Sequence, residues 1–171
     1  AQPSNATANE GATANFAVTA STSSGSPTYQ WERSDDGGAN YAPIGSATNA
    51  TYTTPTLVFA NDNLDRYRVV ASLVGAGASI TSTHGELTVL RVISIQTQPA
   101  STAVIEGGQG TFNIVASITS GAISYQWQKS TNGGGAWTNI NGANSATYTT
   151  PNTVFPTTPS EQFRCILTNA N

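Results

Sequence analysis

The sequence predicts an all-β protein made of two consecutive antiparallel β-sandwiches, and three observations support this. The chain of 171 residues repeats itself when it is shifted by 96 positions. Each copy contains short runs in which apolar and polar residues alternate, as in a sheet with one buried face. No segment carries a sustained apolar stripe with the period of a helix.

The internal repeat gives the domain organisation. "YQWERSDDGG" aligns with "YQWQKSTNGG", and "NATYTTPTLVF" aligns with "SATYTTPNTVF". Of the 75 positions that can be compared without a gap, 26 are identical. Because such self-similarity indicates repeated structural units, we expect one domain over residues 1–92 and a second over residues 93–171.

Each copy reads as a series of short strands. In the first copy, Phe16 and Val18 alternate with polar or small residues, and aromatic or β-branched runs follow at residues 28–34, 50–54 and 65–74. Turn-forming stretches such as "SSGSP", "DDGG" and "ANDN" separate these runs. About seven strands with turns every 8 to 12 residues are typical of a two-sheet sandwich.

Composition argues against two classes of partner. Only 9% of the residues are charged, the formal net charge is -3, and the six Lys and Arg are scattered. Nucleic-acid binding needs clustered cations, so we do not expect it. The longest apolar stretches are far shorter than the roughly 20 residues of a membrane span, so the sequence predicts no membrane segment.

The quoted repeats, with "DRYRVV" in copy one and "EQFRCIL" in copy two, resemble bacterial and bacteriophage immunoglobulin-like domains of the I-set type. The resemblance implies core positions. Trp31 and Trp127 correspond to the buried tryptophan of strand C. The residues at the disulfide positions of strands B and F are Val18 with Val69 in copy one, and Ile114 with Cys165 in copy two.

The resemblance therefore implies domains without a B–F disulfide, in which Cys165 is a small apolar core residue and not a reactive thiol. It also places Tyr67 at the tyrosine corner, where its hydroxyl is expected to bond back to the chain near residues 63–65. Phe163 occupies that position in copy two and lacks the hydroxyl.

Catalytic and metal-binding patterns are not found in the sequence. The single histidine, His84, falls in a predicted turn without a neighbouring nucleophile. Asp35, Asp36 and the "NDNLD" run could bind calcium, but Asp and Asn are also common turn residues. We expect no enzyme activity, no cofactor and no metal.

Two pairs of side chains are candidates for the surface. Tyr41 and Trp137 occupy equivalent positions after the turn between strands C and C′, where an exposed ring could stack on a sugar; alternatively, each ring covers a sheet edge. Arg68 is expected to pair across strands with Glu32.

The junction and the last residues lead to two further expectations. Residues 86–98, "ELTVLRVISIQTQ", contain no Gly, Pro or Ser-rich tract, so we expect a semi-rigid, elongated pair. Asn171 corresponds to Gly75, so copy two lacks the counterpart of strand G, the last strand of copy one. Either the polypeptide continues, or a strand from a partner fills the gap by β-augmentation.

The biological setting follows from the resemblance alone. The style of the repeats is similar to modules in structural proteins of tailed bacteriophages, especially of marine and cyanobacterial hosts. It implies a non-enzymatic module on the surface of a virion, in a capsid, neck, tail or fibre protein, with other virion proteins, copies of itself or host-surface glycans as partners. The alternative is a spacer or adhesive module of a bacterial cell-surface adhesin or a large secreted protein.

Overall fold

The computed structural model describes residues 1–22, 25–73, 78–153 and 161–170. The chain forms two compact units, Ala1–Arg91 (unit 1) and Val92–Asn171 (unit 2). The boundary lies one residue before the one that the repeat suggests. Both units are almost entirely β-structure, and each is described below by itself.

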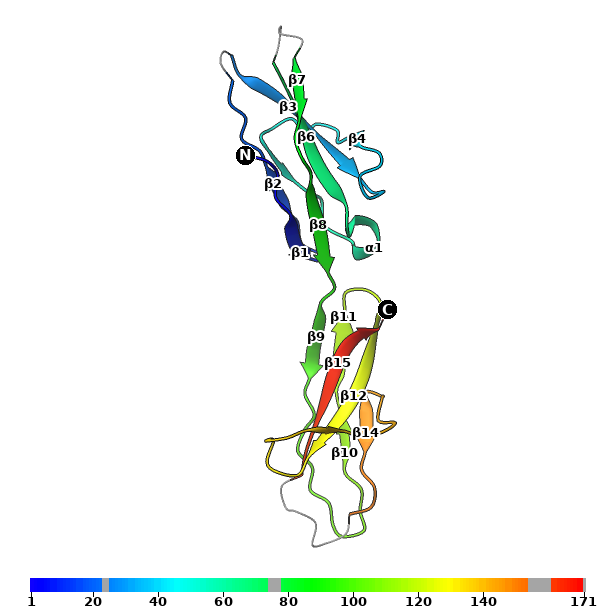
Figure 1. Ribbon diagram of the computed structural model, residues 1–171. Helices are drawn as coiled ribbons and strands as arrows, with labels where there is room; N and C mark the ends of the chain where they lie inside the picture. Colours follow the sequence, from blue (N-terminus) through cyan, green and yellow to red (C-terminus); the bar gives the residue numbers. More distant parts are fainter. Residues whose placement is uncertain (23–24, 74–77, 154–160, 171) are drawn as a thin grey trace. The chain divides into compact units, whose positions relative to one another are not determined.

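Unit 1 contains eight strands and one helical turn among its described residues. They are β1 (Ala6–Asn9), β2 (Asn15–Ala17), β3 (Pro27–Ser34), β4 (Ala42–Pro43), β5 (Thr51–Thr53), α1 (Phe59–Asp62), β6 (Arg66–Leu73), β7 (Ser79–Thr81) and β8 (Gly85–Leu90) (Figure 1).

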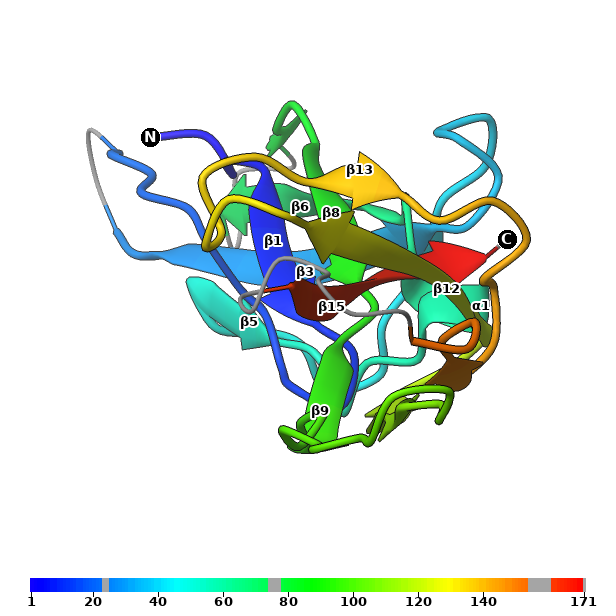
Figure 2. The same ribbon diagram turned by 90° about the horizontal axis from the view of Figure 1, so that it is seen from below.

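The strands of unit 1 form two sheets. One follows the order β1-β8-β6-β3-β4, with β7 also paired to β6, and the other pairs β2 with β5. The β1–β8 pair is parallel, whereas β8–β6, β6–β3 and β3–β4 are antiparallel. The neighbouring positions of β1 and β8 can be followed in both views (Figures 1 and 2).

The core of unit 1 lies between the two sheets. Phe16 from β2 stacks on Tyr67 from β6 with ring centroids 4.6 Å apart, and Trp31 from β3 is fully buried. Leu87 and Val89 of β8, exposed by 0% and 1%, complete this cluster. Aromatic rings from both layers therefore replace the disulfide as the centre of the sandwich.

Glycine is required where β8 passes the first residues of the chain. A Cβ atom on Gly85 would lie 2.4 Å from the backbone oxygen of Ser4. No side chain fits at that distance, so the close approach of the two backbones depends on this residue.

The short helix α1 differs from the sequence-based expectation, which assigns a turn to "ANDN". A single helical turn forms there because the side chain of Asp62 accepts a hydrogen bond from the backbone N–H of Val58, at 2.7 Å. One turn is too short to show a helical period in the sequence.

Unit 2 repeats this plan with seven strands among its described residues. They are β9 (Ile93–Thr97), β10 (Thr111–Asn113), β11 (Val115–Ile118), β12 (Ala122–Ser130), β13 (Thr138–Asn139), β14 (Thr147–Thr149) and β15 (Gln162–Ala170). They pair as β13-β12-β15, β10-β14 and β11-β9. Trp127, on β12, is fully buried.

Unit 2 differs from unit 1 along β15, the counterpart of β6. Within the described part of the chain β15 pairs with β12 alone, whereas β6 also pairs with β7 and β8. Tyr67 and Val69 on β6 are exposed by 2% and 1%, but their counterparts Phe163 and Cys165 are only half-buried. Within the described residues β15 therefore has one strand partner, where β6 has three.

Candidate functional site

The turn between β3 and β4 shares several internal hydrogen bonds with its counterpart between β12 and β13. In unit 1, Asp36 Oδ1 accepts hydrogen bonds from Ser34 Oγ (2.7 Å) and from the backbone N–H of Asn40 (2.9 Å). In unit 2, Asn132 Oδ1 accepts the equivalent bond from the N–H of Ala136 (2.8 Å). The turn therefore presents the residues that follow it in a fixed position.

The bonds to Asp36 also affect its acidity. The backbone N–H of Asn40, with the side chains of Ser34 and Asn40, holds the pKa of the Asp36 carboxyl well below its usual value. Asp36 therefore has a structural role in the turn as a carboxylate, and the calcium alternative loses one of its candidate ligands.

Tyr41 and Trp137 follow the two turns and are half-buried. The guanidinium carbon of Arg68 lies 3.8 Å from the centroid of the Tyr41 ring, and that of Arg164 lies 4.2 Å from the Trp137 ring. Trp137 also donates its indole N–H to the backbone oxygen of Gly134, at 3.1 Å. One face of each ring is thus covered by an arginine.

The two arginines are held in turn by side chains of the neighbouring strand. Arg68 Nε donates to Glu32 Oε2 at 2.7 Å, which confirms the expected cross-strand pair. Arg164 Nε donates to Gln128 Oε1 at 2.8 Å. The arrangement of aromatic ring, arginine and acceptor is therefore repeated in both units, although only unit 1 uses a carboxylate.

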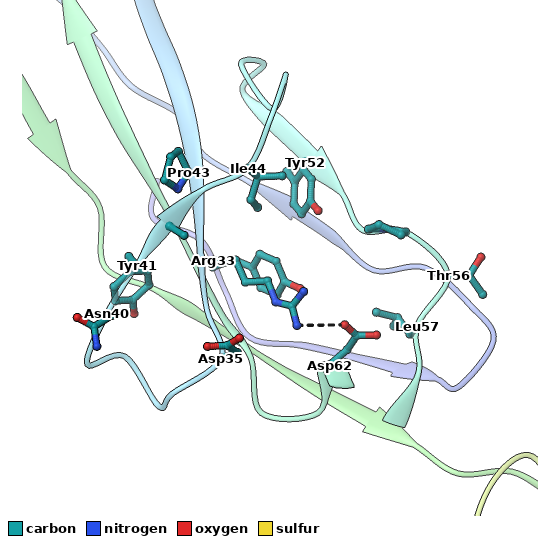
Figure 3. A pocket seen from close by; sticks show the side chains of 13 residues that line it. Arg33, Asp35, Asn40, Tyr41, Pro43, Ile44, Tyr52, Thr56, Leu57 and Asp62 are labelled. Atoms are coloured by element: carbon teal, nitrogen blue, oxygen red, sulfur yellow. Dashed lines mark ion pairs between the residues drawn. The ribbon is translucent and has the colours of Figure 1, made fainter. Parts of the chain in front are cut away.

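A shallow groove of about 520 Å³ lies beside Tyr41 in unit 1, and we call it groove 1. The buried residues Leu57 and Tyr67 contribute to its lining, together with Tyr52 from β5 and Ile44. Asp35, Asn40 and Tyr41 come from the turn between β3 and β4 (Figure 3). Groove 1 combines aromatic and apolar surface with a few polar groups, as ligand sites commonly do.

Arg33 lies within groove 1 and is paired with two carboxylates, of which Figure 3 shows Asp62. Its Nε lies 2.5 Å from Oδ2 of Asp65, a residue exposed by only 2%, and its Nη2 lies 3.4 Å from Oδ1 of Asp62. Nη2 also donates to the backbone oxygen of Asn61 at 2.9 Å. The guanidinium is therefore fixed in place on one side, and the Arg33 side chain as a whole is 37% exposed.

The ionisable groups around Arg33 respond to burial and to each other. Burial disfavours the charged guanidinium, but Asp65, Tyr67 and Asp62 outweigh it and raise the pKa of Arg33. Burial raises the pKa of the Tyr67 hydroxyl, which keeps that group protonated and able to donate toward Asp65 Oδ2, at 3.4 Å. The hydroxyl thus reaches the side chain of Asp65 within the segment expected for the tyrosine corner.

Unit 2 has a smaller counterpart, groove 2, of about 330 Å³. Lys129 and Ile140 occupy the positions of Arg33 and Ile44, and Lys129 Nζ lies 2.5 Å from Glu161 Oε1. Thr131 and Ala136 stand where groove 1 has Asp35 and Asn40. The groove is thus a repeated feature of the fold, but its polar lining differs between the units.

The other predicted core residues lie within their own units. The indole N–H groups of Trp31 and Trp127 donate to the backbone oxygens of Asn49 (2.9 Å) and Ser145 (2.8 Å). Val18 packs against the core of unit 1, and Ile114 is exposed by 2%. Burial raises the pKa of the half-buried Cys165, so its thiol is not activated as a nucleophile.

Among the described residues, the metal-ligating side chains do not form a cluster that could hold an ion. His84 is exposed between β7 and β8, and no three His, Cys, Asp or Glu side chains of the described segments gather around a possible ion. Within the same segments, no helix has the length and apolar character needed to cross a membrane.

Arg33 and Asp65 were not predicted as site residues from the sequence. Their partnership requires the pairing of β3 with β6, in which Arg33 stands opposite Tyr67. One signal was available: the repeat keeps opposite charges at both positions, with Lys129 and Glu161 in copy two.

Comparisons with solved structures identify the fold. The extracellular domains 3–5 of Drosophila OTK match 99% of this chain and 55% of theirs, with 17% identity and a TM-score of 0.50. The four N-terminal immunoglobulin domains of a Dscam1 isoform match with 11% identity and a TM-score of 0.46, and the chain spans 42% of them. At 17% identity the likeness to OTK concerns the fold alone, and both units are immunoglobulin-like sandwiches.

Three domains of the outer capsid protein Hoc from bacteriophage RB49 also match, with 12% identity, a TM-score of 0.42 and coverage of 94% of this chain and 58% of that one. No curated protein matches the sequence. The model of a domain of unknown function, DUF8696, matches residues 2–91 and again residues 95–171, so the chain belongs to the DUF8696 family and contains two copies of its domain.

Proposed function

We propose that the chain is a non-enzymatic module of a bacteriophage virion, part of a capsid, neck, tail or fibre protein. In this role its two immunoglobulin-like units brace the particle or hold weak contact surfaces toward the host. The proposal draws on the resemblance of the repeats to phage structural proteins and on the way in which the two units are joined.

The junction is the observation that carries the proposal. β8 ends at Leu90 and β9 begins at Ile93, so only Arg91 and Val92 lie between them. The guanidinium carbon of Arg91 lies 3.8 Å from the centroid of the Phe59 ring in unit 1. Val92 makes two hydrogen bonds with Thr119 of unit 2. Its backbone N–H donates to Thr119 Oγ1, and its backbone oxygen accepts from the Thr119 N–H, both at 3.1 Å.

Each junction residue is thus attached to its own unit, and the junction lacks the Gly and Ser of a flexible tether. Consecutive modules joined in this way suit a spacer better than they suit a mobile binding domain. The repeated rings of Tyr41 and Trp137 are the proposed recognition residues. Because Arg68 and Arg164 cover one face of each ring, a sugar would contact the remaining face and edge.

For partners we propose other virion proteins, further copies of this chain, and glycans of the host surface. The edge of β15 is the place where an additional strand from a partner would pair, since its half-buried residues Phe163 and Cys165 would gain cover. A protein with these contacts is exposed on the surface of the particle.

Fractionation of an infected culture tests the proposal. Antibody to this chain is expected to detect it in density-gradient fractions that contain particles, at a constant ratio to the major capsid protein. Detection in the cell envelope alone, without particles, would instead support the module of a bacterial adhesin and would contradict the virion assignment.

A further inference from the structure

We propose that groove 1 binds a neutral pyranose ring of a glycan and that groove 2 does not. This inference deepens the proposed function, because it names the class of partner and the surface that receives it. The proposed ligand would contact the lining of groove 1 in unit 1, and not only the rings of Tyr41 and Trp137.

The polar lining of groove 1 has unused hydrogen-bonding capacity. The Asp35 carboxylate is exposed and makes no hydrogen bond or ion pair with the described residues. Asn40 donates its Nδ2 to Asp36 Oδ2 at 2.8 Å, which orients the amide and leaves its oxygen available. Arg33 is held through Nε and Nη2, so Nη1 remains as a donor.

These groups match sugar hydroxyls, which both donate and accept. Hydroxyls can donate to Asp35 and to the oxygen of Asn40, and they can accept from Arg33. Hydrogen bonds to charged groups are stronger than neutral ones. The three side chains belong to the end of β3 and to the turn that follows it, which places them on one side of groove 1 (Figure 3).

The apolar lining of groove 1 suits the C–H face of a pyranose. Tyr52, Pro43, Ile44 and Pro55 line it together with Leu57. Tyr52 is held by the core, since its ring centroid lies 5.7 Å from that of Tyr67. A rigid ring of this kind offers contact area at a low cost in conformational entropy, and a volume of about 520 Å³ has room for one sugar unit.

The charges of groove 1 select among sugars. Its lining carries one cation, Arg33, and two carboxylates, Asp35 and Asp62, while the buried Asp65 lies directly against Arg33. The site is therefore negative overall and disfavours uronic acids, sialic acids and phosphorylated sugars. A neutral sugar brings no charge that would have to be buried.

Groove 2 provides an internal comparison. Thr131 and Ala136 replace Asp35 and Asn40, and the described lining of groove 2 contains no carboxylate. Glu161 lies against Lys129 of groove 2 as Asp65 lies against Arg33 of groove 1. It keeps the cation, as Lys129, and the aliphatic side chain, as Ile140. A sugar that hydrogen-bonds to Asp35 and Asn40 in groove 1 therefore lacks both partners in the described lining of groove 2.

Amide chemical-shift titration of the complete chain tests the inference. The probes are the methyl glycosides of glucose, galactose, mannose and N-acetylglucosamine, with methyl glucuronide and N-acetyllysine amide as acidic and basic comparisons. We expect at least one neutral glycoside to shift the amides of Asn40, Ile44 and Tyr52 in a saturable way, with smaller shifts at Ile140 and Tyr148. The acidic glycoside is expected to bind more weakly than its neutral counterpart.

The double variant D35T/N40A places the residues of unit 2 into unit 1. Unit 2 forms the same turn with these residues, so the variant is expected to fold, which the unchanged positions of distant amides will show. Loss of two hydrogen bonds, one of them to a charged acceptor, predicts binding weakened about tenfold or more. The matched control T131D/A136N changes unit 2 and is expected to leave binding to groove 1 unchanged.

Three results would overturn the inference: no shift near groove 1 with any neutral glycoside, equal shifts in both grooves, or unaltered binding in folded D35T/N40A. Tighter binding of N-acetyllysine amide than of every sugar would also overturn it, in favour of a basic peptide. None of these results changes the particle fractionation, so failure of the inference can be told apart from failure of the proposed function.

Discussion

Arg33 Nε lies 2.5 Å from Asp65 Oδ2, and the equivalent residues of unit 2, Lys129 and Glu161, are paired at the same distance. The charge pair is therefore a repeated element of the module, placed between the strand that carries the buried tryptophan and the chain entering β6 or β15. In unit 1 the carboxylate is buried, because Asp65 is exposed by only 2%.

The first prediction concerns this pair. Arg33→Met leaves Asp65 buried beside an apolar side chain, and we expect unit 1 to lose about 2–3 kcal/mol of unfolding free energy. The figure is below that of a fully buried pair because Arg33 is 37% exposed. Urea unfolding followed by amide signals of each unit separately will measure the loss.

The double variant R33K/D65E is the control, since it transfers the pair of unit 2 into unit 1. We expect it to recover at least half of the lost stability. Equal instability of R33M and R33K/D65E would show that the shape of the original pair matters more than its charge.

The second prediction separates recognition from packing at the paired rings. Tyr41→Ala removes a half-exposed ring and its contact with Arg68, and this costs unit 1 about 1 kcal/mol or less. We expect it to weaken binding of a neutral glycoside to groove 1 while the melting temperature changes little. Trp137→Ala is expected to alter unit 2 alone. Unfolding of either unit would mean that the rings are structural.

The third prediction is a pH dependence that is specific to unit 1. The folded-state pKa of Asp36 is depressed by hydrogen bonds, chiefly from the N–H of Asn40. Such a group stabilises the folded state above its ordinary pKa of about 3.8, and this contribution is lost as the pH falls toward the folded-state value. Amide exchange of Gly38 and Asn40, measured relative to the intrinsic rate at each pH, should therefore accelerate below about pH 4.

Unit 2 carries a neutral amide, Asn132, in the place of Asp36 and serves as the comparison. Its turn amides, Gly134 and Ala136, are expected to lack this acid-induced acceleration. Asp36→Asn should remove the difference between the two turns, and a turn in D36N that still opens at low pH would point to another group.

The fourth prediction concerns the edge of β15. A chain in which residues 76–91 of unit 1 are joined after Asn171 offers unit 2 a strand of the β8 type. Burial of a leucine and a valine predicts about 3–5 kcal/mol of added stability for unit 2. The rate at which Cys165 reacts with a thiol reagent is expected to fall, because the new strand covers it.

The same extension with aspartate at the positions of Leu87 and Val89 is the control, and we expect it to leave unit 2 unchanged. If both extensions stabilise unit 2 equally, added chain length would explain the effect and not strand pairing.

Much of the fold could be predicted from the sequence because its determinants are local or repeated. The alternation around Phe16 predicts a strand, and the shift of 96 residues predicts two similar domains. The resemblance to immunoglobulin-like domains implies the buried positions of Trp31 and Trp127. The Arg68–Glu32 pair was predicted because the two residues stand opposite each other on neighbouring strands, and the register of β3 with β6 confirms it.

The groove could not be predicted in this way. Its residues come from the end of β3, the following turn, β5 and α1, and they meet only when both sheets are assembled. The turn residues Asp35 and Asn40 look like ordinary turn formers in a sequence. Their availability depends on which neighbour, here Asp36, makes the bonds within the turn.

The exposure of the Tyr41 and Trp137 rings could not be predicted from the sequence either. The repeat places the two rings at equivalent positions, but it does not show that Arg68 and Arg164 lie over them. The rotamers of these long arginine side chains are set by their hydrogen-bond acceptors, Glu32 and Gln128. A local sequence pattern does not predict such tertiary contacts.

The most direct test of the proposed function is the copy number of this chain in purified particles, measured by quantitative mass spectrometry against the major capsid protein. A structural module of a virion predicts a reproducible ratio that corresponds to a symmetric arrangement, such as a fixed number of chains per capsomer, neck ring or tail fibre. A ratio that varies between preparations and falls toward zero as the particles are purified would contradict the account.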